Sequence, residues 1–242
     1  MFDSSFEIMN RVEEKHWWFR VRRELLVLLL NKYQIKNQEM SILDVGCGTG
    51  LNSVVLSDFG VVSSLDVSVA ALDYCRAKGL TNVYSGSAEE LPFHDGSFDV
   101  VVAMDVLEHL NDDVKAANEI RRVLKNGGLF ICFVPAFQFL WSKQDEILMH
   151  HRRYIRFSLI NLFCNGWQKI RVSYFNSFLF PMILCVRFFE RFLRLKQRKD
   201  EVEKMSFFNK LFYLIFRSEL PILSNFNFPF GVSLLGVFKK TE

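Results

Sequence analysis

Apolar and polar residues alternate with two different periods along the first half of the chain. Between Arg11 and Tyr33, the run "RRELLVLLLNKY" places apolar side chains at helical spacing, which predicts one amphipathic helix. From Ser41 to Ala136, apolar runs such as "SILDV", "FDVVVAM" and "LFICFVPA" are separated by stretches of helical character. Buried strands that alternate with helices at this spacing predict a parallel sheet with both faces covered.

The alternation changes after the last of these strands. The helix predicted over "DDVKAANEIRRVLKNGG" ends in Gly127 and Gly128, a pair that suits a helix C-terminus. A mixed aromatic and charged segment then follows Ala136. Further on, "WQKIRVSYF" and "VSLLGVFKK" predict two strands, with a long aromatic, basic and helical insertion between them.

Composition narrows the class of protein only a little. The 242 residues are 50% hydrophobic and 24% charged, which fits one large globular domain. A net charge of +3 is too mild to indicate nucleic-acid binding without a concentrated basic stripe. The amino terminus has no basic start followed by an apolar block, so we expect no secretory signal and a cytoplasmic protein. The apolar run from Tyr174 to Val186 is too short to predict a membrane span.

The cysteines predict neither disulfides nor a metal centre. They are odd in number, widely spread and free of any CxxC pair or histidine at ligand spacing. The five are Cys47, Cys75, Cys132, Cys164 and Cys185. We therefore expect reduced thiols and no metal site.

Three glycines directly follow the first predicted strand, in the stretch "ILDVGCGTG". A turn at the carboxyl edge of a parallel sheet lets a ligand approach the backbone, so the pattern favours a nucleotide-like cofactor. The dinucleotide fingerprint has its third glycine one position later, where this chain has Leu51. Asp66 ends the second strand, where an acid can accept hydrogen bonds from ribose hydroxyls. The alternative is a tight strand-to-helix connection without a ligand.

Several motifs together resemble a known family. The stretches "ILDVGCGTG", "LDVS", "GSAEELPFHDGSFDVVVAMDVLEHL" and "EIRRVLKNGGLFICFVPA" are similar, in order, to those of class I S-adenosylmethionine-dependent methyltransferases, a group that includes the ubiquinone and menaquinone methylases. "EEKHWWF" and "HRRY" resemble a bacterial subgroup. The resemblance implies a Rossmann-like α/β fold: a doubly wound, mostly parallel seven-stranded sheet with an antiparallel last strand, an N-terminal lid helix and a helical insertion before that strand. We divide the chain into a lid (1–40), a cofactor-binding core (41–136), a substrate cap (137–160) and the insertion (177–228).

The same resemblance implies which residues hold S-adenosylmethionine. The glycine turn would frame its methionine portion, the second strand end its ribose, the turn after the third strand its adenine, and the fourth strand end the cleft. These residues are Asp44, Gly46, Cys47, Gly48, Thr49, Gly50, Asp66, Val67, Ser68, Ser87, Ala88, Met104 and Asp105. The family often has an acid where this chain has Ser87, so adenine would have a weaker partner here. A sulfonium with an ammonium-bearing tail calls for acids and carbonyls, which agrees with these residues.

Candidate residues for the methyl acceptor lie after the fourth and fifth strands. His109 is our first candidate for a general base and His151 the second. Candidate substrate contacts are Glu108, Trp141, Asp145, His150, Arg152, Arg153 and Tyr154. Paired arginines favour an acceptor with an anionic group, although the same arginines could instead pair with acids of the chain.

The insertion leaves three functions open. Phenylalanines interleaved with basic residues are typical of a helix in a membrane interface, and equally of a hairpin that packs on the domain or forms a homodimer. We expect methyl transfer, to oxygen of an amphiphilic or lipid-linked small molecule, with peripheral contact at the inner membrane face. The alternatives are methylation of a soluble sugar or metabolite, and a non-catalytic cofactor-binding scaffold. No nucleic-acid partner is expected.

Overall fold

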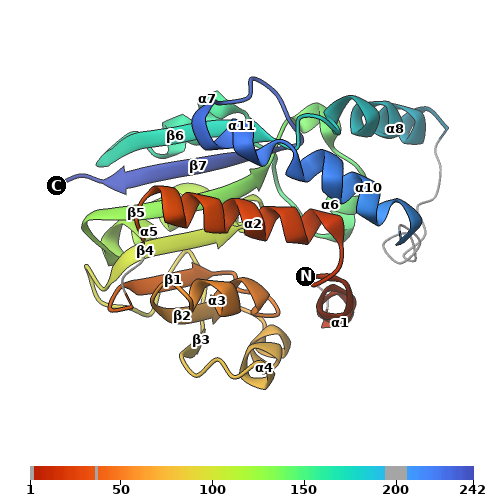
Figure 1. Cartoon of the computed structure of the whole chain (residues 1–242). Coiled ribbons are helices and arrows are strands. Elements are labelled where there is room, and N and C mark those ends of the chain that lie inside the picture. The colour runs from red at the N-terminus through yellow and green to blue at the C-terminus, as the bar shows by residue number, and fades with distance from the viewer. Residues whose placement is uncertain (1–2, 36–37, 194–205) are drawn as a thin grey trace.

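The computed structural model describes residues 3–35, 38–193 and 206–242. Its strands are β1 (Ser41–Val45), β2 (Val61–Asp66), β3 (Val83–Ser85), β4 (Phe98–Met104), β5 (Leu124–Pro135), β6 (Trp167–Phe175) and β7 (Ser233–Lys240). They form one sheet in the order β3-β2-β1-β4-β5-β7-β6, in which β7 runs antiparallel to β5 and β6 (Figure 1). The predicted mostly parallel seven-stranded sheet with an antiparallel last strand is confirmed.

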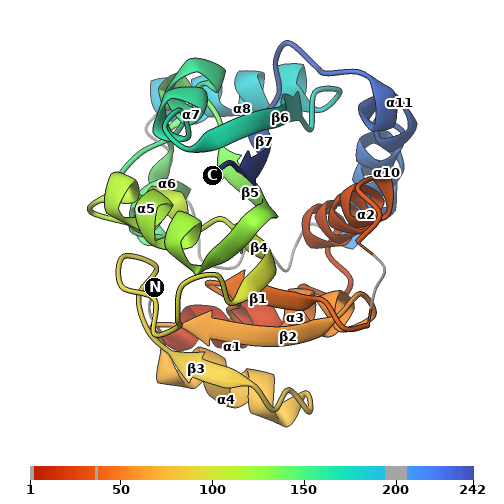
Figure 2. The same ribbon diagram turned by 90° about the vertical axis from the view of Figure 1, so that its left-hand side faces the viewer.

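Helices cover both faces of this sheet. The helical elements are α1 (Asp3–Val12), α2 (Trp17–Lys32), α3 (Leu51–Leu56), α4 (Val69–Ala77), η1 (Leu107–His109), α5 (Asp113–Val123), η2 (Gln138–Leu140), α6 (Lys143–Ile147), α7 (Arg156–Leu162), α8 (Phe180–Leu193), α10 (Ser206–Arg217) and α11 (Leu220–Asn225). Figure 2 shows α2, α10 and α11 on one side of the sheet and α5 and α7 on the other. Each side has its own buried apolar core, because alternate strand residues point to opposite faces.

The N-terminal helix predicted from Arg11 to Tyr33 is two helices. Helix α1 ends at Val12 and α2 begins at Trp17. Between them, the buried side chain of Glu13 turns inward to accept a hydrogen bond from the Thr49 hydroxyl. A tertiary contact of this kind ends the helix although the local residues favour helix.

The glycine pair after α5 is not a helix cap. The helix ends at Val123, and Leu124 already pairs with Phe98 as the first residue of β5. The register then shifts, so that Leu129 is opposite Val100. Gly127 has a φ of 79°, as expected where a strand carries an irregular turn.

The insertion packs one face against the N-terminal helices. Phe216 of α10 is fully buried and contacts the rings of Trp17 and Trp18. Asn209, also on α10, accepts a hydrogen bond from the Trp17 amide at 2.7 Å and so caps α2 from 192 residues away. The insertion therefore supports the lid, as in the packing alternative. Residues 194–205 of the expected insertion lie outside the described part of the chain.

Replacing Phe216 tests this packing. We expect Phe216→Ala to lower the free energy of unfolding by about 3–5 kcal/mol, because it leaves a cavity between α10 and α2. Phe188→Ala is the control, since that ring on α8 is 73% exposed, and its effect should stay within about 0.5 kcal/mol. Urea denaturation followed by circular dichroism measures both values. Equal, small losses would mean that the insertion does not hold the lid in solution.

Candidate active site

The glycine turn between β1 and α3 has a backbone that side chains would disturb. Gly46, Gly48 and Gly50 have φ angles of 67°, 55° and 86°, in the region that favours glycine. A Cβ on Gly46 would also lie 2.5 Å from Val106 Cγ2, and one on Gly50 would lie 2.8 Å from Cys75 Sγ. Backbone conformation and packing thus both require glycine here, and the α3 amino end faces the same edge of the sheet.

Asp66 holds the neighbouring turn at the end of β2. Its carboxylate accepts hydrogen bonds from the Gly48 amide at 3.0 Å and the Ser68 amide at 2.9 Å. Val67 is 71% exposed beside it. The acid expected at the ribose therefore lies against the glycine turn.

Asp44 lies beneath the turn in a chain of buried hydroxyl groups. The Ser53 hydroxyl donates to Asp44 Oδ2 at 2.6 Å, and the Ser64 hydroxyl lies 2.8 Å from that of Ser53. Burial, together with the negative charge of Asp66, raises the pKa of Asp44 to about 7, against the opposing effect of the Ser53 hydrogen bond.

Helix α1, in the predicted lid segment, lies against the glycine turn. A Cβ on Gly48 would lie 2.8 Å from the terminal methyl of Met9. Glu13 is 4% exposed, and its Oε1 lies 3.4 Å from Lys78 Nζ. Carboxylates around a glycine cradle suit a cationic amino-acid tail, so the residues present fit S-adenosylmethionine.

The remaining expected cofactor residues lie at the same edge. Met104 ends β4, and Asp105 follows it with a φ of 58°. Ser87 and Ala88 follow β3, where the Ser87 hydroxyl accepts a hydrogen bond from the Glu89 amide at 3.1 Å. All five cysteines are free thiols, as expected.

A buried arginine of the lid helix reaches this edge. Arg22 is 3% exposed and pairs with Asp105. Its Nε and Nη2 atoms have no hydrogen-bond partner in the described structure, and its guanidinium lies 5.1 Å from the Trp18 ring centroid. No local pattern distinguishes Arg22 from the other arginines of "RVRRE", so the sequence analysis missed it.

Glu108, His109 and His150 form a cluster beside Asp105. The rings of His109 and His150 lie 4.6 Å apart, nearly perpendicular. Burial and the neighbouring His150 lower the pKa of His109 to about 4. Burial, reinforced by the charge of Asp105, raises the pKa of Glu108 well above its usual range. The structure brings His150 against the first candidate base, whereas the His151 side chain is exposed.

The other expected substrate residues of the cap are bonded within the protein. Arg153 donates two hydrogen bonds to Asp145, at 2.8 and 2.9 Å. Burial alone would raise the pKa of Asp145, but hydrogen bonds from His150 and Arg153 hold it well below its usual range. Arg152 pairs with Asp113, and the buried Tyr154 hydroxyl donates to the same carboxylate.

These bonds remove one basis for the anionic acceptor. Both arginines of "HRRY" already have carboxylate partners, which is the alternative considered from the sequence. Trp141 is half-buried at the end of η2. The cap residues therefore shape the loop that carries His150. Among the described residues, Arg22 is a buried arginine with two nitrogens, Nε and Nη2, that have no hydrogen-bond partner.

The strand order, the glycine turn and the acid at the end of β2 define a class I methyltransferase fold. Residues 43–132 match the family model described as "Methyltransferase domain". A "Probable S-adenosylmethionine-dependent methyltransferase" of Mycolicibacterium smegmatis is 32% identical over 50% of this chain and 47% of its own length. Demethylmenaquinone methyltransferase of Staphylococcus aureus is 31% identical over 61% of this chain and 64% of its own.

A solved structure resembles nearly the whole chain. It is a complex between the Haloferax volcanii Trm112 methyltransferase activator and a methyltransferase, with a TM-score of 0.65, 19% identity, and coverage of 100% of this chain and 96% of that one. The chain therefore resembles methyltransferases in sequence over residues 43–132 and in fold over its whole length. It spans about half the length of the first curated relatives it matches.

The raised pKa of Asp44 predicts how stability depends on pH. The folded protein holds a proton that the unfolded chain releases near pH 4, so this contribution is greatest below pH 4 and is lost as pH rises through about 7. Asp44→Asn abolishes the titration. Between pH 5 and 8 we expect its stability to rise relative to the parent protein by on the order of 2 kcal/mol.

Urea denaturation at several pH values measures this difference. Asp73→Asn is the control, because that side chain is 67% exposed. A constant offset between Asp44→Asn and the parent across this pH range would contradict the assignment.

Proposed function

We propose that this chain transfers a methyl group from S-adenosylmethionine to a small-molecule acceptor. The observation that carries the proposal is the meeting, at one sheet edge, of the glycine turn with Asp66 and the partly buried cluster of Glu108, His109 and His150. S-adenosylmethionine supplies an electrophilic methyl carbon on a sulfonium. The chain must hold that group, exclude water and align an acceptor nucleophile with it.

The cofactor residues have distinct tasks in this proposal. The glycine turn and Asp44 would lie along the methionine portion, and the buried carboxylate of Glu13 would contribute negative charge beside the ammonium group. The Asp66 carboxylate now accepts hydrogen bonds from the Gly48 and Ser68 amides. With the cofactor bound, it would instead accept hydrogen bonds from the ribose hydroxyls. Trp17 and Trp18, in the lid above Phe133 and Phe216, keep water from this side of the cleft.

The acceptor side is formed by the cluster and Arg22. His109, our first candidate base, would contact the acceptor atom, with His150 beside it. Arg22 would bind an anionic group of the acceptor through the two nitrogens that have no partner in the described structure. This replaces the role first given to Arg152 and Arg153.

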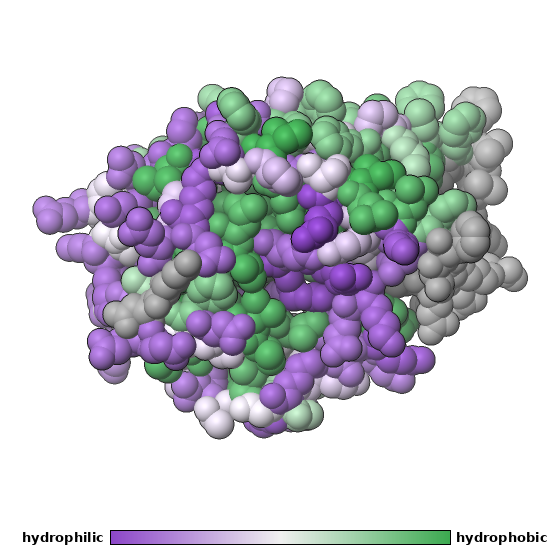
Figure 3. Space-filling model, in the orientation of Figure 1, coloured by the Kyte–Doolittle hydropathy of each residue, from purple (hydrophilic) through white to green (hydrophobic). Residues whose placement is uncertain are grey.

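We further propose an amphiphilic acceptor reached at a membrane surface. Phe188 and Phe189 on α8 and Phe208 on α10 are 73%, 65% and 51% exposed, and basic residues Arg187 and Lys210 lie on the same helices. Figure 3 shows hydrophobic residues gathered over this part of the molecule. Exposed aromatic rings beside basic residues suit an anionic lipid surface. The relationship to demethylmenaquinone methyltransferase supports such an acceptor.

Within the described residues, every helix is too short or too polar to cross a bilayer.

Substitution of Asp66 tests the cofactor assignment. We expect Asp66→Ala to weaken binding of S-adenosylmethionine at least tenfold, because about 1.4 kcal/mol is lost with even one charge-assisted hydrogen bond. Isothermal titration calorimetry measures the dissociation constant. Asp73→Ala, an exposed acid on α4, is the matched control and should bind as the parent does. Unchanged affinity in Asp66→Ala would contradict the ribose assignment.

Flotation with vesicles tests the membrane contact. Vesicles with anionic lipid should carry the protein upward in a density gradient, with less binding at high salt. The double variant Phe188→Ser/Phe189→Ser should lose this binding, whereas Phe157→Ser, which removes a 69% exposed ring on α7, should retain it. Equal flotation of both variants, or none by the parent protein, would favour a soluble acceptor instead.

A further inference from the structure

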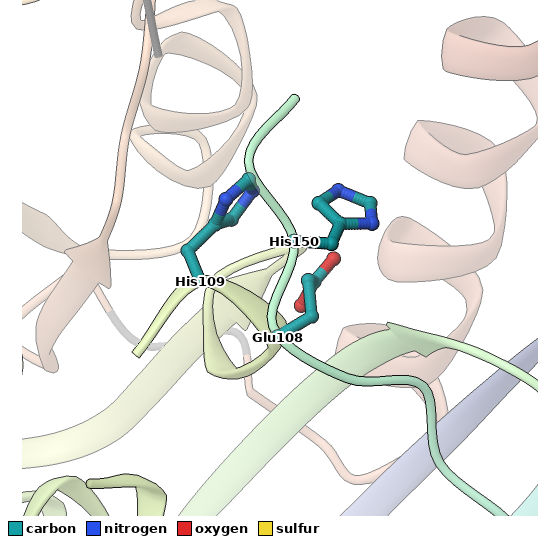
Figure 4. A group of neighbouring side chains, drawn as sticks. All are labelled: Glu108, His109 and His150. Carbon is teal, nitrogen blue, oxygen red and sulfur yellow. The ribbon is translucent and has the colours of Figure 1, made fainter. Parts of the chain in front are cut away.

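Two histidines and a glutamate converge where β4 ends. Glu108 and His109 belong to η1, and His150 comes from the cap loop more than forty residues later. One ligand atom from each lies within 4.8 Å of the other two, which is a spacing that a single cation can bridge (Figure 4). Two imidazoles and a carboxylate are a common donor set for zinc and for other first-row transition metals.

Glu108 is the independent sign that something is bound here. Its side chain is fully buried, and neither carboxylate oxygen has a hydrogen-bond partner among the described residues. The two nearby arginines already pair with other acids, Arg22 with Asp105 and Arg153 with Asp145. An unsatisfied buried carboxyl group costs free energy, and a cation in contact with it removes that cost.

His150 is oriented as a metal-bound histidine would be. Its Nδ1 lies 2.9 Å from Asp145 Oδ1, and Asp145 is itself fixed by two hydrogen bonds from Arg153. A carboxylate behind a histidine sets the ring orientation and leaves the other nitrogen, Nε2, for a ligand. The Asp145–Arg153 pair, part of the cap that the sequence analysis took for substrate contacts, thus supports the cluster from behind.

We propose that Glu108, His109 and His150 bind a divalent transition-metal ion such as Zn²⁺ at the acceptor side of the cleft. Mg²⁺ and Ca²⁺ prefer sites made of oxygen ligands, so they suit this donor set less well. Three protein ligands leave a coordination position open. If the proposed methyl transfer holds, an acceptor hydroxyl in that position would lose its proton more readily. His109 would then act as a metal ligand and not as a free base.

Metal binding is measured on the full chain without cofactor or acceptor. After removal of metals with a chelator, we expect one equivalent of Zn²⁺ to bind in calorimetry, Co²⁺ to give the visible absorption of a nitrogen- and oxygen-bound ion, and Mg²⁺ to bind far more weakly. Glu108→Gln and His150→Ala should each weaken Zn²⁺ binding by about 100-fold. His94→Ala and Glu146→Gln, which alter exposed side chains of the same types, are the matched controls.

Thermal unfolding separates the metal site from a purely structural role. Zn²⁺ should raise the Tm of the parent protein and leave that of Glu108→Gln unchanged. Without metal, Glu108→Gln should be at least as stable as the parent, because it removes a buried ionisable group. A parent protein that binds no Zn²⁺ or Co²⁺, or variants that bind as tightly as the parent, would overturn the proposal.

The outcome is independent of the proposed function. Binding of S-adenosylmethionine without metal binding would overturn this site and leave methyl transfer intact. Metal binding without S-adenosylmethionine binding would support this site and overturn the proposed methyl transfer.

Discussion

Parallel pairing of β1 with β2 and β4 is the constraint on which the site depends. Because these strands run the same way, the turns that follow them all lie at one edge of the sheet. The glycine turn, Asp66 and Asp105 are far apart in the sequence and meet only there. The register is held by apolar residues that point alternately into the two cores, so a slip by one residue would bury the wrong side chains and separate the turns.

Ionisable groups are buried around this edge at a density that stability alone does not explain. Asp44, Glu108 and Arg22 are each almost inaccessible to solvent, and Glu108 and Arg22 keep polar atoms without partners in the described structure. Groups of this kind lower stability unless a ligand completes their bonding. In the proposed function, the acids around the glycine turn would face the cationic cofactor. The carboxylate with two imidazoles beyond β4 would face the acceptor.

The insertion links the lid to the rest of the molecule. Its α10 caps α2 through Asn209, and Tyr213 and Arg217 both bond Glu24 of the same helix. Arg22, two residues before Glu24 on α2, pairs with Asp105. Anything that shifts α10, such as contact of its exposed face with a partner or a lipid surface, would therefore act on the helix that carries Arg22.

The sequence by itself determined the parallel sheet, the glycine turn and Asp66. These features follow from local periodicity and from backbone conformations that only glycine adopts easily, so they can be read from neighbouring residues. It also predicted the two strands that flank the insertion, β6 and β7, with bounds that agree to within one residue. It predicted one helix where the structure has α1 and α2, and Glu13, between the two, contacts Thr49, far away in the sequence. The tertiary structure alone decided that Arg152 and Arg153 pair within the protein, that Arg22 pairs with Asp105, and that His150 joins Glu108 and His109. The physical reason is that the partners of a charged side chain are set by which loops the fold brings together, and no local pattern records that.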